Sequence, residues 1–275
     1  MGYRVVLGPH VLAREGYLAG SDALRAADLN RMFHDPSVRA VWFARGGFGT
    51  ARILDHLDLR AAARNTEVLI GYSDVTALFA ALHRRPRPVC LYGPVVAELG
   101  EPSSFDSASL RKLLLGESVA LGFPKRGVLR AGRAEGRLFG GTLTLLVHLL
   151  GTRYLPDLKG TILFLEDTGE EAYRLDRMLT QLRMSGLLAG VRGVVLGAFD
   201  AHPPKRAFPP DRPILDLVRE TFLPLDVPVV MGLQAGHVPK KRTLPLGGTA
   251  RLDTAAGRLE VEVRPQVAPR AVRVQ

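Results

Sequence analysis

The first third of the chain alternates short apolar runs with segments in which apolar residues recur every three or four positions. Runs of strand length lie at residues 3–8, 40–44, 68–70 and 88–93, and helical spacing lies at residues 21–35, 50–57 and 75–82. Ser21 precedes the first helical segment as an N-cap, and Pro36 ends it. Strands that alternate with helices in this way predict an α/β fold with a parallel sheet.

The pattern loosens between residues 98 and 132, where we expect the connection between two domains. We place the N-terminal domain at residues 1–115 and the C-terminal domain at residues 116–275. The second half then predicts, in order, a Gly-Gly turn and an apolar helix from residue 139, a strand at 161–166, a polar turn at 167–171, a helix at 172–188 and a strand at 193–199. Alternating residues at 246–263, interrupted by a glycine-bearing turn, predict a β-hairpin.

The segment Gly-Tyr-Ser-Asp at residues 71–74 joins an apolar strand directly to an amphipathic helix, and it has two interpretations. In one, Ser73 or Asp74 caps the helix. In the other, the tight turn presents the Ser73 hydroxyl above the sheet, as in a nucleophile elbow. This stretch alone favours the cap, because no second glycine follows at the G-x-S-x-G spacing. The turn and the glycine-rich segment 44–49 both follow strands, and sites in parallel sheets gather at such carboxyl ends.

A serine nucleophile needs a base, and the chain has seven histidines. His83 lies ten residues after Ser73 on the same helix, about 15 Å away at the rise of an α-helix, so we exclude it as a direct partner. His237 differs from the others because it follows a glycine just past an apolar strand. Strand alternation places Glu166 and Asp167 on opposite faces, and either supplies a carboxylate to orient the base.

An oxyanion hole needs backbone N–H groups that converge on the carbonyl oxygen of the substrate. The N–H of Asp74, directly after the serine, is one candidate, and the N–H of Gly47 in the segment RGGFG is the other. This glycine segment matches neither dinucleotide-binding nor P-loop spacing. No His, Cys or carboxylate residues have metal-ligand spacing, so we expect no metal and no cofactor.

Composition and charge exclude several classes of protein. The chain has 275 residues, of which 47% are hydrophobic, enough for a substantial core in one or two domains. No apolar run approaches the roughly 18 residues of a membrane span, and no signal-peptide pattern opens the chain, so we expect a cytoplasmic protein without a membrane partner. The single cysteine, Cys90, excludes an intramolecular disulfide and is expected to be a buried hydrophobe. The net charge of +10 comes mainly from scattered arginines without a nucleic-acid motif, so we expect no nucleic-acid partner.

Five segments taken together resemble the LD-carboxypeptidase family, which also contains the microcin-immunity peptidases. They are RGGFGTARILDHLD, IGYSDVTALFAAL, FGGTLTLLVHLLGT, ILFLEDTGEEAYRLDRMLTQL and GHVPKKRTLPLG. The resemblance implies a serine peptidase with the triad Ser73, Glu166 and His237, so that capping becomes at most a secondary role for Ser73. It also implies a flavodoxin-like or Rossmann-like N-terminal domain, a β-rich C-terminal domain, a site between the two domains and a homodimer.

The implied substrate is the murein tetrapeptide of cell-wall recycling, cut between an L-centre and the terminal D-alanine. Arg45, beside the glycine segment, is a candidate for binding the free terminal carboxylate, with a merely structural role as the alternative. Two positions depart from the family: Lys241 and Thr142 stand where Asn is common. Two rival functions remain, an immunity-type hydrolase of a peptidyl-nucleotide antibiotic and a non-catalytic peptide-binding protein.

The family usually opens with an apolar strand, a loop and a helix before the strand that reads GYRVVLG here. A strand–helix unit of about 30 residues is then missing. Without this unit, neighbouring strands of the parallel sheet would lack backbone hydrogen-bond partners, and apolar surface that a helix should cover would be exposed. We therefore expect Met1 to be an internal or misassigned start, which the DNA upstream tests.

Overall fold

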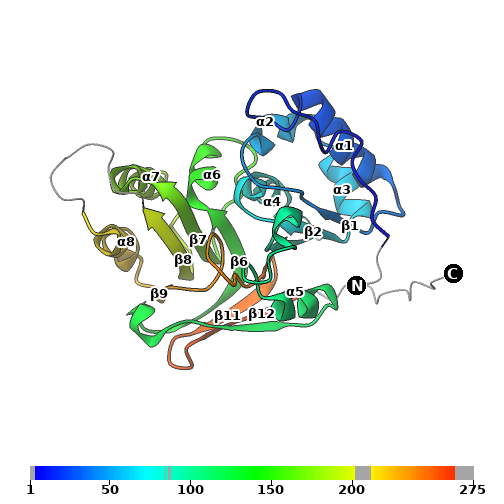
Figure 1. Cartoon of the computed structure of the whole chain (residues 1–275). Coiled ribbons are helices and arrows are strands. Elements are labelled where there is room, and N and C mark those ends of the chain that lie inside the picture. Colours follow the sequence, from blue (N-terminus) through cyan, green and yellow to red (C-terminus); the bar gives the residue numbers. More distant parts are fainter. Residues whose placement is uncertain (1–3, 84, 86–87, 202–211, 264–275) are drawn as a thin grey trace.

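The computed structural model describes residues 4–83, 85, 88–201 and 212–263. These residues form two sheets that lie side by side (Figure 1). The first sheet contains, in spatial order, β1 (Ala40–Trp42), β2 (Val68–Gly71), β3 (Val89–Tyr92) and β10 (Leu244–Leu246). The second sheet contains, in spatial order, β4 (Val119–Gly122), β12 (Arg258–Glu262), β11 (Thr249–Asp253), β6 (Arg133–Thr142), β7 (Thr161–Glu170), β8 (Gly193–Ala201), β9 (Val229–Met231) and β5 (Val128–Arg130).

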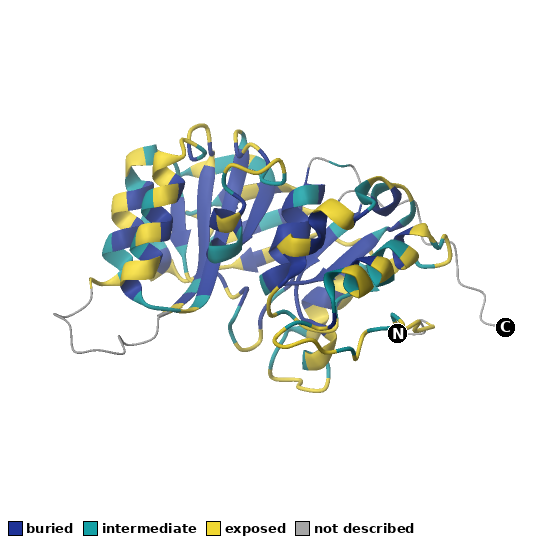
Figure 2. Ribbon diagram, turned by 90° about the horizontal axis from the view of Figure 1, so that it is seen from above, coloured by how far each residue is buried: buried dark blue, intermediate teal, exposed yellow. Residues whose placement is uncertain are grey.

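Helices connect and cover these strands. The α-helices of the described residues are α1 (Asp22–His34), α2 (Thr50–Ile53), α3 (Leu59–Asn65), α4 (Thr76–Leu82), α5 (Ser107–Leu114), α6 (Leu143–His148), α7 (Ala172–Met184) and α8 (Ile214–Phe222). The short 3₁₀ turns are η1 (Leu54–His56), η2 (Ser73–Val75), η3 (Val96–Glu98), η4 (Lys125–Gly127) and η5 (Leu223–Leu225). The strands are largely buried, whereas the helices turn exposed faces outward (Figure 2).

The strand directions confirm the predicted α/β class. β1, β2 and β3 pair in parallel, and so do β6, β7, β8 and β9. α6 packs on β6, β7 and α7, and α7 packs on α8. The predicted C-terminal hairpin is also confirmed, because β11 and β12 pair antiparallel, with β11 continuing onto β6. The second sheet is therefore mixed, with a parallel centre.

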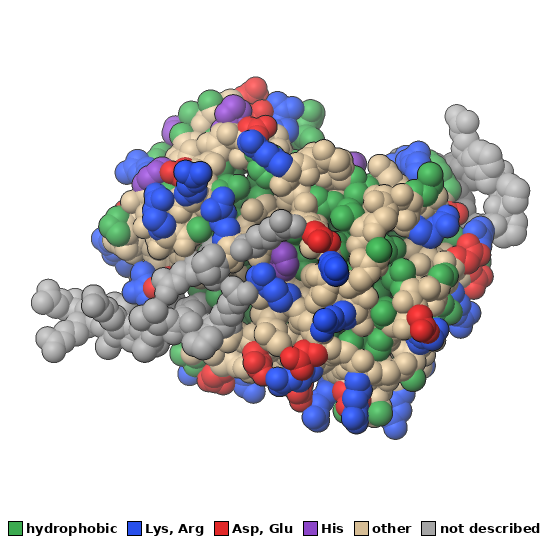
Figure 3. Space-filling view, turned by 180° about the vertical axis from the view of Figure 1, so that it is seen from behind, with side chains coloured by type: hydrophobic (Ala, Val, Ile, Leu, Met, Phe, Trp, Pro, Cys, Tyr) green, Lys and Arg blue, Asp and Glu red, His purple; other side chains and the backbone are tan. Residues whose placement is uncertain are grey.

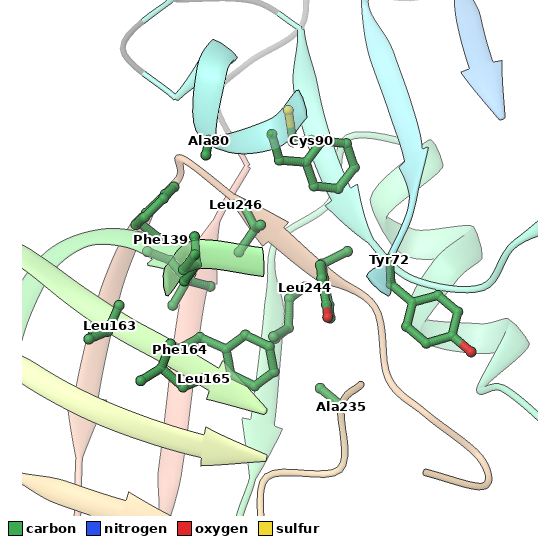
Figure 4. Packing of buried hydrophobic residues seen from close by; sticks show 14 of the residues in the cluster. Tyr72, Ala80, Cys90, Phe139, Leu163, Phe164, Leu165, Ala235, Leu244 and Leu246 are labelled. Atoms are coloured by element: carbon green, nitrogen blue, oxygen red, sulfur yellow. The ribbon is translucent and has the colours of Figure 1, made fainter. Parts of the chain in front are cut away.

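β10 links the two halves of the chain. It comes from the C-terminal half but pairs antiparallel with β3, with Leu244 opposite Tyr92 and Leu246 opposite Cys90. Figure 4 shows Leu244 and Leu246 between the strands of the first sheet and Phe139 of the second. The predicted domain boundary after residue 115 falls between α5 and β4, and β10 crosses back over it.

Three local predictions are wrong. Residues 4–8 of the expected first strand form no strand, and Val5 is 78% exposed, because β1 is the edge of the first sheet and no neighbour pairs with this run. Gly140 and Gly141 do not turn but extend β6, at φ values of 151° and 147°. The expected polar turn after Glu166 is a continuation of β7 to Glu170.

The structure also bears on the predictions for Cys90, for membrane-spanning helices and for the distribution of charge. Cys90 is buried, as expected for a small hydrophobe, and burial raises the pKa of its thiol. None of the helices in the described ranges combines the length and apolar character needed to cross a bilayer. On the face shown in Figure 3, basic side chains lie among acidic ones rather than in one unbroken band.

Candidate active site

Ser73 lies directly after the carboxyl end of β2, in a strained turn. Its φ of 63° is in the left-handed region, which a non-glycine residue seldom occupies. The turn continues through η2 into α4, whose N-terminus has no side-chain cap from Ser73 or Asp74. Capping of α4 therefore does not explain the serine, and the geometry resembles that of a nucleophile elbow.

Glu166 and His237 form a direct contact. Glu166 Oε2 lies 2.8 Å from His237 Nδ1 and also accepts the backbone N–H of His237 at 3.0 Å. Glu166 is completely buried within β7, whereas His237 is partly exposed in the loop after β9. The carboxylate therefore holds both the ring and the backbone of the histidine. Sequence alternation left Glu166 and Asp167 open, and Glu166 is the one on this face.

The other oxygen of Glu166 is held by two hydroxyl groups. Tyr92 at the end of β3 donates to Oε1 at 2.6 Å, and Thr142 at the end of β6 donates at 2.8 Å. Burial raises the pKa of Glu166, but the hydrogen bond and charge of His237 and the hydrogen bond from Tyr92 outweigh it, so the pKa lies below its usual value. Burial and the charge of Glu166 raise the pKa of Tyr92 well above its usual value, which keeps the phenol protonated as a donor.

Tyr72 brings the histidine next to the turn that carries Ser73. The rings of Tyr72 and His237 have centroids 4.8 Å apart. Among the described residues, no hydrogen bond joins Ser73 Oγ to the His237 ring. Catalytic hydrogen bonds are often long without substrate and shorten when it binds, so the arrangement is compatible with proton transfer.

Lys241 lies over the Tyr72 ring. Its ammonium group is 2.6 Å from Glu98 Oε1 and 5.0 Å from the Tyr72 ring centroid, and the side chain is only 5% exposed. Tyr72 donates to the same oxygen of Glu98 at 2.9 Å. Lys241, one of the departures from the family pattern, therefore has a structural partner. Thr142, the other departure, contacts Glu166 directly.

Glycines let backbone approach the site from two sides. A Cβ on Gly46 would lie 3.1 Å from Ser73 Cβ and 3.4 Å from its Oγ. A Cβ on Gly236, whose φ is 91°, would lie 2.5 Å from the carboxyl group of Glu166. The close contact therefore requires glycine at position 236, and at position 46 it leaves little room for a side chain. The segment that contains Gly47 lies next to Ser73, although Gly47 itself is exposed, with φ of 118°.

The sequence also singled out Arg45, Asp167 and His83. Arg45 is exposed and makes no hydrogen bond or ion pair within the described part of the chain. Asp167 points to the opposite face of β7, where it contacts Thr144 of α6. His83 packs against Phe139, with ring centroids 4.4 Å apart. No cluster of three metal-ligating side chains occurs in the described ranges.

Sequence reasoning missed three contributors: Tyr72, Tyr92 and Glu98. Tyr92 ends a parallel strand, so the same strand-end rule that singled out Ser73 also applies to it. Tyr72 immediately precedes Ser73 but carries no motif of its own. The contact between Glu98 and Lys241 spans 143 residues of sequence, and no local pattern indicates it.

Residues 1–93 match the family model of the LD-carboxypeptidase N-terminal domain, and residues 135–252 match that of the LD-carboxypeptidase C-terminal domain. The chain belongs to the LD-carboxypeptidase family. This confirms the resemblance stated from the five sequence segments, and it makes the chain a member of a family of serine carboxypeptidases.

Two relatives are similar over most of their length. A Streptomyces coelicolor protein provisionally named a carboxypeptidase is 41% identical, over 94% of this chain and 83% of its own. The murein tetrapeptide carboxypeptidase of Pseudomonas aeruginosa is 37% identical, over 90% of this chain and 83% of its own. The crystal structure of muramoyltetrapeptide carboxypeptidase from Oxalobacter formigenes has a TM-score of 0.83 and 32% identity, and the match covers 96% of this chain and 91% of that one.

The microcin C7 self-immunity protein MccF shares the fold. Its wild-type structure has a TM-score of 0.82 at 24% identity, covering 96% of this chain and 87% of its own. At this identity the likeness shows the fold alone. The immunity-type alternative therefore has weaker support than the carboxypeptidase.

Proposed function

We propose that this protein is a serine-type LD-carboxypeptidase that removes the terminal D-alanine from murein tetrapeptide. The relatives with the same name support the substrate. The observation that carries the chemistry is the 2.8 Å contact between Glu166 Oε2 and His237 Nδ1, beside a serine in a strained strand-end turn. This contact supplies the acid–base half of a hydrolytic triad, and it supports Ser73 as the nucleophile.

In the proposed mechanism, Ser73 Oγ attacks the carbonyl carbon of the scissile amide while His237 Nε2 takes the hydroxyl proton. Glu166 remains ionised, fixes the ring through Nδ1–H and stabilises the imidazolium. The backbone N–H groups of Gly47 and Asp74 bind the oxyanion. The C–N bond then breaks, His237 returns the proton to the leaving amine, and D-alanine departs. Water, deprotonated by His237, hydrolyses the acyl-enzyme and restores Ser73.

Recognition of the free terminal carboxylate is assigned to Arg45, which is exposed on the glycine segment and makes no ion pair within the described ranges. An unpaired guanidinium suits bidentate binding of a carboxylate. The proposal also includes a homodimer, which the family resemblance supports, and a cytoplasmic location. Size-exclusion chromatography with light scattering tests the dimer.

Mass spectrometry of reaction products tests the substrate assignment. Purified protein is incubated separately with murein tetrapeptide, with an all-L tetrapeptide and with a peptidyl-nucleotide. We expect tripeptide and D-alanine from the first and no cleavage of the second. Cleavage of the peptidyl-nucleotide alone would support the immunity-type function. Failure of a serine-directed phosphonate to label Ser73, with no cleavage of any substrate, would support a non-catalytic binding protein.

A further inference from the structure

Two of the proposed catalytic residues are each followed in sequence by an aspartate. The carboxyl group of each aspartate accepts hydrogen bonds from a threonine on a neighbouring segment. Asp74 follows Ser73, and its Oδ2 accepts the backbone N–H of Thr50 at 2.8 Å and the Thr50 hydroxyl at 2.6 Å. Both side chains are buried, at 6% and 8% exposure. Two hydrogen bonds to one carboxyl oxygen, away from water, fix the relative position of the two segments.

The second sheet repeats this arrangement. Asp167 follows Glu166, and its Oδ2 accepts the backbone N–H of Thr144 at 2.8 Å and the Thr144 hydroxyl at 2.7 Å. Each threonine is the first or second residue of a helix that follows a glycine-containing segment. That segment is residues 46–49, beyond the end of β1, for Thr50, and Gly140 and Gly141 within β6 for Thr144. The same device thus anchors a glycine segment to a catalytic strand end twice in the molecule.

Neither helix has a side-chain cap from its own N-cap residue. The N-cap residues are Gly49 for α2 and Thr142 for α6, and neither side chain caps its helix. The first N–H groups of a helix lack partners within it, so the aspartates supply an acceptor from another element. The position of each helix start, and of the glycine segment before it, therefore depends on the aspartate.

Besides this anchor, segment 46–49 makes only a few contacts, one of which is that of the Phe48 ring with Tyr17, at a centroid distance of 5.8 Å. Gly47 and Gly49 adopt φ values of 118° and 121°, where glycine has wide conformational freedom. Gly46 packs against Ser73, and the Gly49 carbonyl accepts a hydrogen bond from Arg25 at 2.9 Å. Because glycine allows several backbone conformations, an anchor favours the one in which the N–H groups point at a reacting carbonyl before the substrate arrives.

We propose that Asp74 and Thr50 are positioning residues, which hold segment 46–49 so that its backbone N–H groups stabilise the oxyanion formed at Ser73. This inference rests on the proposed function. The side chain of Asp74 acts through the glycine segment and touches no reacting atom. Its effect should therefore appear in the transition state rather than in substrate binding.

Thr50→Val, which removes the hydroxyl but keeps the shape, tests the anchor. We expect kcat for release of D-alanine to fall about tenfold, less than the loss of a whole oxyanion donor, with KM changed less than about twofold. Thr50→Ser restores the hydroxyl and should recover wild-type kcat. Thr221→Val is the matched control, because the Thr221 hydroxyl is equally buried but bonds to Leu217 in α8, and it should leave kcat unchanged.

Asp74→Asn provides a second test if Thr50→Val does not fold. Its amide oxygen still accepts both hydrogen bonds but lacks the charge, so we expect about a threefold loss of kcat at unchanged KM. Unchanged kcat in both variants, or a Thr50→Ser variant no better than Thr50→Val, would overturn the inference while the carboxypeptidase function stands. Wild-type protein that releases no D-alanine would instead overturn the proposed function, and with it the inference.

Discussion

Glu166 and Asp167 are consecutive residues of β7 whose carboxyl groups face opposite sides of the sheet and have opposite pKa shifts. Glu166 has a lowered pKa, because contacts with His237 and Tyr92 outweigh burial. Asp167 has a raised pKa, because burial outweighs the hydrogen bonds from Thr144 and its own neighbour. Burial is common to both, so the contacts of Glu166 with His237 and Tyr92 account for the difference.

The two carboxyl groups should therefore affect the pH dependence of stability in opposite directions. Ionised Glu166 stabilises the fold above its usual pKa of 4.5, and this contribution is lost as pH falls through the lowered folded-state pKa. The protonated form of Asp167 is favoured in the fold below 3.8, and this contribution is lost as pH rises through the raised pKa. Relative to wild type, Glu166→Gln should become less stable as pH rises between the folded-state and unfolded-state pKa values of Glu166. Asp167→Asn should become more stable, relative to wild type, as pH rises between the two pKa values of Asp167.

Urea unfolding of wild type and both variants between about pH 3 and pH 7 measures these differences. The slope of the free energy of unfolding against pH, taken as variant minus wild type, should be negative for Glu166→Gln and positive for Asp167→Asn. Slopes of the same sign would contradict the opposite assignments.

Ser73→Ala should leave the protein folded and nearly inactive. Loss of a triad nucleophile can lower turnover by on the order of a millionfold. His83→Ala is the comparison, because His83 packs on Phe139 and has no place in the proposed mechanism, so its kcat should change little even if stability falls. Turnover with murein tetrapeptide and circular dichroism of each variant provide the measurement. A tenth of the wild-type activity in Ser73→Ala would refute the nucleophile, and a collapse in His83→Ala would point to a different base.

Sequence reasoning located individual residues where local rules apply. Ser73 was recognisable because a strand runs into a helix through one short polar turn, and strand alternation separated Glu166 from Asp167 without deciding between them. The choice depends on which face meets His237, a contact across 71 residues of sequence. The hydroxyl groups of Tyr92 and Thr142 were not predicted to contact Glu166. The Thr142 contact depends on the register of β6 with β7, and the Tyr92 contact forms only when the two sheets are assembled.

At the scale of elements, loops from different parts of the chain hold the histidine segment. Lys241 follows Lys240, which has a left-handed φ of 49°. The Lys241 backbone N–H donates to Ser104 O, and its carbonyl accepts the N–H of Asp106. The buried ion pair with Glu98 then ties this segment to η3. The position of His237 therefore depends on contacts with residues that precede it by more than 130 positions.

Lys241→Met should destabilise the protein, because it leaves the Glu98 carboxylate without its cation. Breaking one partner of a buried ion pair is costly, and since Glu98 is 21% exposed we expect a loss of about 2 kcal/mol in the free energy of unfolding. The double variant Lys241→Met/Glu98→Gln should recover much of that loss, because no unpaired charge remains. Lys240→Met, at the exposed neighbouring lysine, is the matched control and should change stability little. Urea unfolding that ranks the double variant below the single one would contradict this account.

Element predictions succeeded where side-chain periodicity decides the structure and failed where backbone contacts do. α1 was predicted with its Ser21 cap, which accepts the N–H of Leu24. The Gly-Gly pair at 140–141 suggested a turn, but a Cβ on Gly140 would lie 1.7 Å from the Phe164 carbonyl oxygen. These glycines allow close packing in β6, and composition alone does not distinguish that use from a turn.

At the scale of the whole molecule, β10 makes the two sheets dependent on one another. Leu244 is completely buried, pairs with the end of β3, and lies on the side that meets β6 and β12 (Figure 4). The site also combines residues from both sheets, because Ser73 and Tyr92 come from the first sheet and Glu166 comes from the second. Two halves that moved freely would lose the hydrogen bond between Tyr92 and Glu166.

The two sheets should therefore unfold together. Trp42, the only tryptophan, lies in β1 and reports on the first sheet by fluorescence, while hydrogen exchange of residues 161–170 reports on the second. Both probes should give the same urea midpoint. Leu244→Ala should lower both midpoints equally, with a loss of about 3 kcal/mol as for other buried leucines.

Leu179→Ala, in α7 on the second sheet, is the stricter comparison, because Leu179 is only 1% exposed and belongs to an element distant in sequence from Trp42. If the molecule is one cooperative unit, this variant should also shift the Trp42 transition, by as much as it shifts exchange in β7. A Trp42 midpoint that responds to Leu244→Ala but not to Leu179→Ala would show that the first sheet unfolds on its own. In that case, β10 would stabilise the first sheet without joining it energetically to the second, and the contact between Tyr92 and Glu166 would form between two independently stable halves.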